Sequence, residues 1–406
     1  MSTPRGRLTA LLVSDATTLL GAAMAVTATP FVVLAAGGTQ ADLAWVAIAV
    51  LSAEIFALAV GGVLADRISR HWVMMGSDLL QAAASAAVAI AFSVGAASAT
   101  LVIGLSALRG LGLGLFLPAS QGILPQIVDP ARLTKANSLR RVTANIAQIG
   151  GALAGGVLVT VVGPGPAMGA ITVAFFLGAA CRAGLRALPA RTESAESLVS
   201  AARGGFREFA SRRWLWSVVL GFAVVNAAFI GCVSVLGPLT VSATLGGASS
   251  WGAIAAATAA GAVLGSALAY PWRPRRPLVV AVLFAVLLAS EPAALASGVF
   301  TAALVGAAAA GLGMEVFGVL WVSVLQQHVP TEALSRVSAF DAMGSFAVSP
   351  LGPLAAGVAA AAFGVPFALM ATSALIAAVC GCLLLSPDIR QVTGLPRTVG
   401  ARQPVA

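Results

Sequence analysis

Runs of about 20 mostly apolar residues, the length that crosses a bilayer as a helix, recur along almost the whole chain. They predict twelve membrane spans, at roughly 8–35, 43–65, 72–95, 99–122, 137–162, 166–188, 214–240, 250–271, 277–296, 299–325, 336–362 and 365–386. Only 9% of the 406 residues are charged, whereas about 25% is usual in a soluble domain. The chain is therefore expected to be an all-α membrane protein, and a water-soluble enzyme is excluded.

The basic residues mark one side of the predicted membrane. They lie before span one, in every second connection after it and in the tail, whereas the alternate connections have none. Of the 23 basic residues, only Arg109 is assigned to the interior of a span; those near span ends are counted with the adjoining connections, Arg140 and Arg141 between spans four and five and Arg182 with the central loop. Basic residues concentrate in cytoplasmic loops, so both termini and the central loop are predicted to be cytoplasmic. Because the arginines are scattered, they do not indicate a nucleic-acid-binding patch.

Other residue types argue against cofactor chemistry. Lys135 is the single lysine and no GxxxxGK[ST] loop is present, so ATP is not expected to drive the protein. The four cysteines lie in apolar runs, and the two histidines, His71 and His328, have no ligand partners nearby in the sequence. We therefore expect no metal, no cofactor and no disulfide framework.

Two segments recur about 200 residues apart, an offset close to half of the chain. LPQIVDP at 124–130 resembles LQQHVP at 325–330, and GALAGGV at 151–157 resembles GPLAAGV at 352–358. A six-plus-six duplication leaves such a pattern. The predicted organisation is a six-helix half at 1–188, a cytoplasmic linker at 189–213, a second six-helix half at 214–386 and a cytoplasmic tail at 387–406.

The linker has an amphipathic stretch from Leu198 to Trp214. Leu198, Ala202, Phe206 and Phe209 share one helical face, with arginines on the other. This pattern predicts either a helix that lies on anionic lipid or a plain solvated linker.

The connection between spans two and three reads GGVLADRISRH at 61–71. It resembles the signature loop of the major facilitator superfamily, G-x-L-A-D-R-x-G-R-R. The matching residues are Gly62, Leu64, Ala65, Asp66, Arg67 and Arg70, while Ser69 and His71 depart from the pattern. The resemblance implies twelve helices in two six-helix halves related by pseudo-twofold symmetry, and a secondary transporter that acts by alternating access.

The signature loop also suggests a gate. Gly62 permits close helix approach, and Asp66 can cap a neighbouring helix N-terminus. By the resemblance, that neighbour is span eleven, whose first turns carry Arg336 and Asp341, so a charge latch is expected on the cytoplasmic side. Asp78 is expected to support the loop. The alternative is a charge cluster that sets topology without gating.

Charged residues inside the spans are the candidates for coupling, because each costs about 2.5–3.5 kcal/mol to insert. Arg109, in RGLGLG at 109–114, resembles the span-four arginine motif of proton-coupled members. The resemblance places spans one and four side by side, so Asp15 is expected to pair with Arg109 or share a proton with it, or to form a purely structural ion pair. Glu315 is predicted to line the cavity as a second proton or cation site. Glu54 is an alternative partner of Arg109.

Neutral and aromatic residues complete the predicted cavity. Gln148 and Asn226 are the polar candidates, and Trp321 supplies an aromatic wall. Glu291, which interrupts span nine, is expected to be wet and near the outer surface. GGALAGG at 150–156 resembles the span-five antiporter motif but lacks its proline.

These residues predict a plasma-membrane transporter rather than an enzyme. The expected activity is export of a small amphiphilic drug or metabolite in exchange for protons, by a monomer in the lipid bilayer. The QxVP and SPLG stretches resemble the bacterial siderophore- and macrolide-exporter branch. Alternatives are uptake or uniport of a small polar metabolite, and a membrane protein without transport.

Overall fold

The computed structural model describes residues 4–67, 69–128, 133–183 and 206–393. No strand occurs within these ranges, and twelve helical segments in them are long and apolar enough to cross a membrane. The all-α membrane fold is thus confirmed.

The first six spans are single helices. Their bounds are α1 (Pro4–Ala35), α2 (Gln40–Arg67), α3 (Arg70–Ser93), α4 (Ala99–Ile127), α5 (Leu133–Val162) and α6 (Pro164–Ala183). Among the last six, spans eight, ten and twelve are single helices, α10 (Ala248–Ala269), α13 (Phe300–His328) and α16 (Val365–Leu385). Span seven consists of α8 (Arg213–Gly231), the π-helical η2 (Cys232–Leu236) and α9 (Gly237–Thr244), and span nine of α11 (Pro277–Ala285), the 3₁₀-helical η3 (Val286–Ala289) and α12 (Ser290–Ala296). Span eleven consists of α14 (Thr331–Phe346) and α15 (Leu351–Phe363). The short α17 (Pro387–Gln391) follows.

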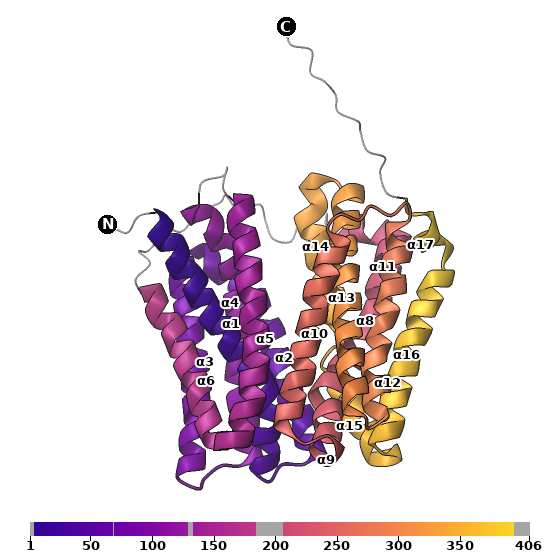
Figure 1. The fold of residues 1–406 in the computed structure, drawn as a ribbon. Helices are drawn as coiled ribbons and strands as arrows, with labels where there is room; N and C mark the ends of the chain where they lie inside the picture. The colour runs from indigo at the N-terminus through magenta and orange to yellow at the C-terminus, as the bar shows by residue number, and fades with distance from the viewer. Residues whose placement is uncertain (1–3, 68, 129–132, 184–205, 394–406) are drawn as a thin grey trace.

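The two ends of the helix bundle differ in their connections. We call the end at which α1 begins and α17 lies the terminal end, and the other the distal end (Figure 1). All positive-φ glycines of the described chain lie in distal connections, namely Gly37, Gly95, Gly163, Gly246, Gly247, Gly298 and Gly364. Glycine adopts this left-handed conformation without a Cβ clash and so ends a helix in a tight turn. Short, uncharged turns therefore close the distal end, whereas the basic connections lie at the terminal end.

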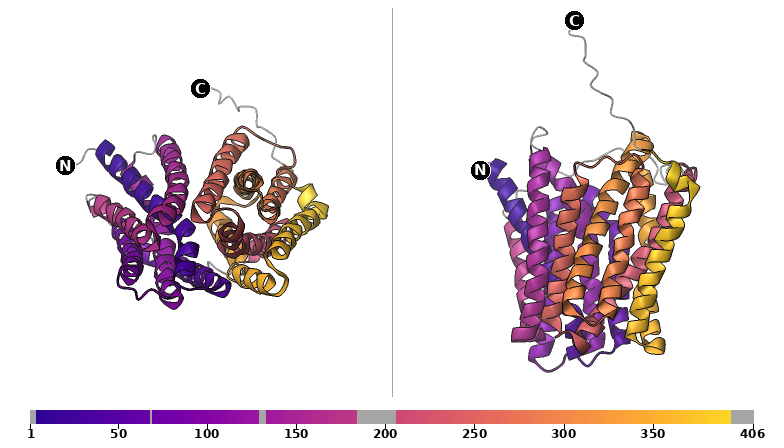
Figure 2. Two further views of the ribbon diagram at one scale, coloured as in Figure 1. Left: turned by 60° about the horizontal axis from the view of Figure 1, so that its bottom comes forward. Right: turned by 45° about the vertical axis from the view of Figure 1, so that its right-hand side comes forward.

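The spans form two bundles, spans one to six and spans seven to twelve, which lie side by side (Figure 2). The repeated segments occupy equivalent places in them. Val128 donates its N–H to the Leu124 carbonyl at 3.1 Å, and Val329 donates to Leu325 at 3.0 Å, with nearly equal backbone angles at the two valines. Gly151 packs against the Leu20 carbonyl of span one. The internal duplication is therefore structural as well as sequential.

The second repeated glycine packs in the same way. Gly352 lies against the Ala227 carbonyl of span seven, and any side chain at Gly151 or Gly352 would collide with the facing backbone. Small residues allow such close approach of membrane helices.

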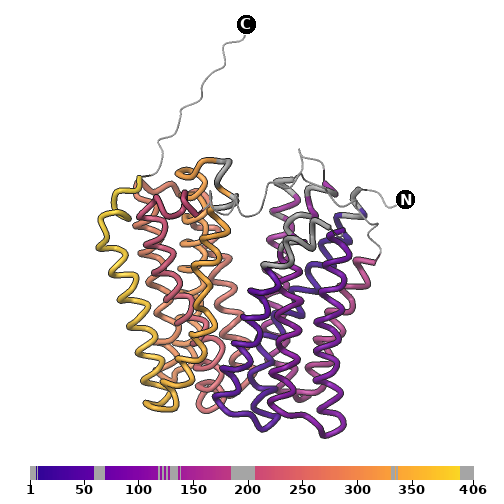
Figure 3. Tube along the Cα trace, turned by 180° about the vertical axis from the view of Figure 1, so that it is seen from behind, coloured from indigo at the N-terminus to yellow at the C-terminus, as the bar shows by residue number. Residues whose placement is uncertain are grey.

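The two bundles meet at the distal end and diverge toward the terminal end (Figures 1 and 3). Gly156 of α5 packs against Ala248 of α10, and Ser249 donates its N–H to Thr160 Oγ1 at 3.1 Å. Gly357 of α15 packs against α2 in the same region. Close backbone packing thus closes the distal end, and the helices of the two bundles diverge toward the terminal end.

Several sequence predictions fall on residues that the structure describes only in part. Gly62, Asp66 and Arg67 lie in the last turns of α2, but their side chains, like that of Arg336, are outside the described residues. Arg70 begins α3. The latch between Asp66 and span eleven therefore stays a prediction.

The linker and tail also extend beyond the described ranges. Residues 184–205 and 394–406 lie outside them. The rings of Phe206 and Phe209 both contact Phe340 of α14, at 5.7 and 6.1 Å between centroids. These two residues of the predicted amphipathic face therefore pack on span eleven.

Candidate functional site

Two cavities adjoin at span seven. The larger, which we call the C-terminal cavity, has a volume of about 500 Å³ and is lined mainly by α8, α13 and α14. The smaller, the N-terminal cavity, has a volume of about 210 Å³ and is lined by α1, α2 and α4. Val233 and Ser234 of η2 line both. The π-helical turn of span seven is therefore the wall that the two cavities share.

The sequence explains why span seven is irregular at this wall. Pro238 has no N–H and cannot complete an α-helical hydrogen bond to the Ser234 carbonyl. The N–H of Gly237 instead bonds back to the Cys232 carbonyl, one residue further than in an α-helix. Single π-helical turns of this kind are frequent at functional sites.

One carboxylate faces the C-terminal cavity. Asp341 Oδ2 accepts a hydrogen bond from Trp321 Nε1 at 2.8 Å, and Oδ1 accepts one from Ser345 Oγ at 3.3 Å. Asn226 Nδ2 donates to the Ser345 carbonyl at 3.1 Å. Asp341 was expected to take part in the cytoplasmic gate, but its side chain lies in the cavity wall, held by neutral donors.

Aromatic rings surround this carboxylate. Phe222 and Phe317 stack at 3.7 Å between centroids, and the Phe317 and Trp321 rings are nearly parallel at 6.1 Å. Phe229 and Phe346 also line the cavity. Aromatic faces and a carboxylate both attract cations. The C-terminal cavity is therefore suited to an amphiphilic molecule with a positive charge.

Arg109 and Glu54 face the N-terminal cavity. An Nη1 atom of Arg109 donates to Thr29 Oγ1 at 2.7 Å, while its buried Nε has no partner. Gly110 and Gly114 bring α4 against the α2 backbone at Val50 and Glu54. Within the described chain, Glu54 and Arg109 line the same cavity without an ion pair.

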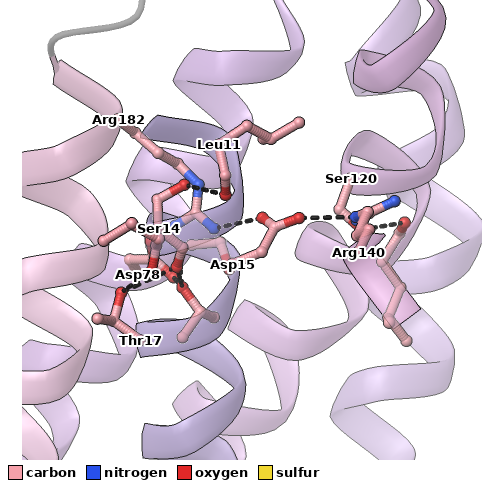
Figure 4. Close-up of polar contacts among 12 residues, drawn as sticks. Leu11, Ser14, Asp15, Thr17, Asp78, Ser120, Arg140 and Arg182 are labelled. Atoms are coloured by element: carbon pink, nitrogen blue, oxygen red, sulfur yellow. Dashed lines mark hydrogen bonds and ion pairs between the residues drawn. The ribbon is translucent and has the colours of Figure 1, made fainter. Parts of the chain in front are cut away.

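Asp15 belongs to a buried ionic network, not to the cavity. It pairs with Arg182 of α6 at 3.0 Å and with Arg140 of α5 at 2.8 Å (Figure 4). Arg182 also pairs with Asp78 of α3, which accepts a hydrogen bond from Thr18 at 2.9 Å. The expected pairing of Asp15 with Arg109 is wrong, because two arginines on other spans lie closer.

Two further expectations about this network are corrected. Arg182 was expected in the central loop, but it is 0% exposed in the last turn of α6. Asp78 was expected to support the signature loop, but it pairs with Arg182. With two carboxylates and two guanidinium groups, the network is electrically balanced. A sequence signal was available, since Asp15 and Asp78 both lie inside spans near the terminal end.

Glu315 lies at the boundary between the two bundles. It accepts hydrogen bonds from Ser266 Oγ of α10 at 2.7 Å and from Arg141 of α5 at 3.4 Å. Its neighbours Met314 and Phe317 line the C-terminal cavity, but Glu315 does not.

Gln148 is exposed on α5 and lines neither cavity. Of the predicted cavity residues, the structure thus places Arg109, Glu54, Asn226 and Trp321 in the walls.

Glu291 differs most from its prediction. The side chain is 1% exposed, and its Oε2 has no hydrogen-bond partner. The Glu-Pro pair was expected to interrupt span nine, but it lies in the helix α12 inside the second bundle. The expectation that Glu291 is solvated is therefore wrong.

Comparison with known proteins places this architecture. A family model described as Major Facilitator Superfamily matches residues 11–290. The multidrug efflux pump Tap of Mycolicibacterium fortuitum is 29% identical over 236 residues, 57% of this chain and 58% of the pump. The chain thus aligns with little more than half of that relative. An uncharacterized MFS-type transporter, y4rN of Sinorhizobium fredii, is 26% identical over 357 residues, 86% of this chain and 87% of the relative.

Solved structures share the fold. A bacterial homolog of the human lysosomal transporter Spinster, inward-facing and unoccupied, matches with a TM-score of 0.68 at 17% identity, covering 95% of this chain and 97% of that one. An auto-inhibited POT family peptide transporter matches with a TM-score of 0.76 at 13% identity, covering 97% and 99%. At these identities the likeness shows the twelve-helix architecture alone.

Proposed function

The chain belongs to the major facilitator superfamily, and from this premise we propose that it exports small cationic amphiphiles in exchange for protons. One chain supplies both bundles and both cavities, so a monomer suffices for transport. The substrate crosses as the two bundles rock about the central site, opening alternately to each side of the plasma membrane.

Asp341 in its aromatic cavity is the observation that carries the proposal. A single carboxylate attracts one positive charge, while the rings of Phe222, Phe317 and Trp321 give an apolar body a large contact surface. Sugars and multiply charged ligands need many more polar partners than this cavity offers. A monovalent organic cation fits the chemistry best.

The topology supports export as the proposed direction. The basic connections lie at the terminal end, and the positive-inside rule assigns that end, with both termini, to the cytoplasm. The open cavity then faces the cytoplasm, where an exporter collects its substrate. The name of the Mycolicibacterium fortuitum relative, a multidrug efflux pump, supports the same direction.

Transport into inside-out membrane vesicles tests the proposal. With an imposed pH gradient, acid inside, the wild-type chain is expected to accumulate a fluorescent organic cation more than its neutral isostere. Asp341→Asn should remove that preference, while Glu208→Gln, the same type of change in a terminal-end ion pair with Arg212, should keep it. Accumulation of the neutral compound alone, or cation movement in the opposite direction, would contradict the proposal.

A further inference from the structure

Glu291 is the most deeply buried acid in the second bundle. Among the described side chains of residues 206–393 it is the one buried carboxylate, at 1% exposure. Its Oε2 has no hydrogen-bond partner. The acids Asp15 and Asp78 are equally buried in the first bundle, but Arg182 compensates both. The buried acids of the first bundle are thus paired with an arginine, whereas the buried acid of the second bundle is not.

No lysine or arginine lies on the described helices that pack around Glu291. Its side chain interacts with the Thr258 hydroxyl of α10 and is within electrostatic reach of the Cys232 thiol of η2. The elements packed against α12 are α9, α13, α16 and η3, and neither they nor α10 and η2 contain lysine or arginine. An ionised carboxylate in this place would be a buried, uncompensated charge, which is strongly unfavourable.

The other titratable groups on these elements lie far along their helices. Gly306 of α13 contacts Ser290, and Glu315 follows nine residues later, about 14 Å away at 1.5 Å per residue; His328 is still further. Ser373 of α16 contacts Ala289, and Cys380 and Cys382 follow at least seven residues later, about 10 Å away. Only Cys232 is close.

The α-helix is interrupted just before Glu291, and hydrogen bonds to two neighbouring spans hold the interruption in place. The α-helix changes to the 3₁₀ turn η3 just before it, and Pro292 follows it. Ser290 Oγ donates to the Gly306 carbonyl at 2.7 Å, and Ser373 Oγ donates to the Ala289 carbonyl at 2.8 Å. These bonds fix the break to spans ten and twelve. Interrupted membrane helices recur at the coupling sites of transporters.

Cys232 connects this buried acid to the transport path. It is the first residue of η2, whose Val233 and Ser234 line both cavities. The same turn packs against α2 and α15, where the bundles meet at the closed distal end. Opening of the distal end must therefore rearrange the wall between Glu291 and the cavities.

We propose that Glu291 carries the proton that is exchanged for substrate. Its carboxylate takes up a proton when the distal end is open, and the neutral acid is then buried behind η2 while the terminal end is open. Arrival of substrate in the C-terminal cavity displaces η2, and the proton leaves to the cavity. The inference rests on the proposed function, because it names the coupling group of that exchange.

Proton release on substrate binding tests this assignment. Purified full-length protein in weakly buffered detergent is mixed with a fluorescent organic cation, and the released protons are read with a pH indicator. Wild-type protein is expected to release protons, whereas Glu291→Gln should release none. It should still bind the cation but with lower affinity, because a side chain that stays neutral mimics the protonated acid that the cation must displace. Glu208→Gln is the matched control and should behave like wild type.

Infrared spectroscopy detects the protonated carboxyl group directly, so its signal would not change on cation binding if Glu291 had only a structural role. The protonated carboxyl band lost from wild-type protein when the cation binds should be missing in Glu291→Gln. Thr258→Val, which keeps the acid, should retain the band but shift it and the pH midpoint of proton release. Proton release that persists in Glu291→Gln would overturn the assignment to Glu291. Binding without proton release in wild-type protein would instead contradict the exchange itself, and both proposals with it.

Discussion

Asp15 of α1 and Arg182 of α6 form an ion pair of 3.0 Å inside the first bundle, across 167 residues of sequence. The Arg182 guanidinium lies 5.1 Å from the centre of the Phe116 ring. The pair therefore ties together spans one, three, four and six, with Asp78 as the link to span three. Because both charges are removed from water, their mutual neutralisation decides whether this bundle is stable.

Arg182→Met should destabilise the protein strongly. It removes the shared cation and leaves Asp15 and Asp78 buried with less compensation, for which about 3–5 kcal/mol is typical. A marked fall in the melting temperature of the purified protein is expected, measured by tryptophan fluorescence. Arg207→Met, at an exposed position, is the control.

A second substitution distinguishes charge from packing. In the double variant Arg182→Met with Asp78→Asn, one uncompensated charge is gone, so part of the lost stability should return. A double variant that is no more stable than Arg182→Met alone would show that packing of the arginine, rather than charge balance, holds the bundle together.

Thr29→Val should impair transport more than stability. The Thr29 hydroxyl is the acceptor for Arg109 in the N-terminal cavity, and hydrogen bonds to charged groups contribute about 1.5–3 kcal/mol. Without it, the guanidinium loses its fixed position beside Glu54. The initial rate of cation transport should fall about tenfold or more, while Thr29→Ser keeps the acceptor and most of the activity. Equal activity of the valine and serine variants would contradict this role.

Gly156→Val should prevent full closure of the distal end. Gly156 of α5 lies against the Ala248 carbonyl and Gly252 of α10, across the boundary between the bundles. A larger side chain must push the two helices apart. Distances between spin labels on the distal ends of α5 and α10 should lengthen, and transport should fall. The control is Gly169→Val in α6, where a side chain meets no neighbour within 4 Å; unchanged distances in Gly156→Val would refute the close-packing argument.

Much of the fold was predictable because the bilayer imposes helix length and the basic connections mark one end of the bundle. Val365–Leu385, for example, nearly coincides with the span expected at 365–386. The repeats at Leu124 and Leu325 also anticipated equivalent helix ends. These features depend on local composition and on duplication, both of which can be recognised in the sequence alone.

Side-chain partners were harder to predict because they depend on which helix faces meet. Arg182 ends an apolar run, and from the sequence such an arginine looks the same whether it faces loop water or a buried acid. Phe340 packs against Phe206 of the predicted linker, whereas the side chain of the next residue, Asp341, lines the cavity. Glu291 was expected to be wet because it interrupts span nine beside a proline, but the bonds of Ser290 and Ser373 show that the break is internal.

Trp321 should contribute to cation binding through its ring rather than its N–H group. Trp321→Phe keeps an aromatic face beside Phe317 but removes the Nε1 donor to Asp341. The freed carboxylate remains available to the ligand, so affinity for an organic cation should be kept or slightly raised. Trp321→Leu removes the π face and should weaken binding by about 0.5–2 kcal/mol. Dissociation constants from fluorescence anisotropy of a cationic dye measure both effects.

A neutral isostere of the dye separates cation–π attraction from simple contact area. The affinity of the neutral dye should be similar in Trp321→Phe and in wild-type protein. In Trp321→Leu, the loss of affinity should be smaller for the neutral dye than for the cation. Equal losses for the two dyes would mean that Trp321 acts only as apolar surface. In that case the charge preference of the cavity would rest on Asp341 alone.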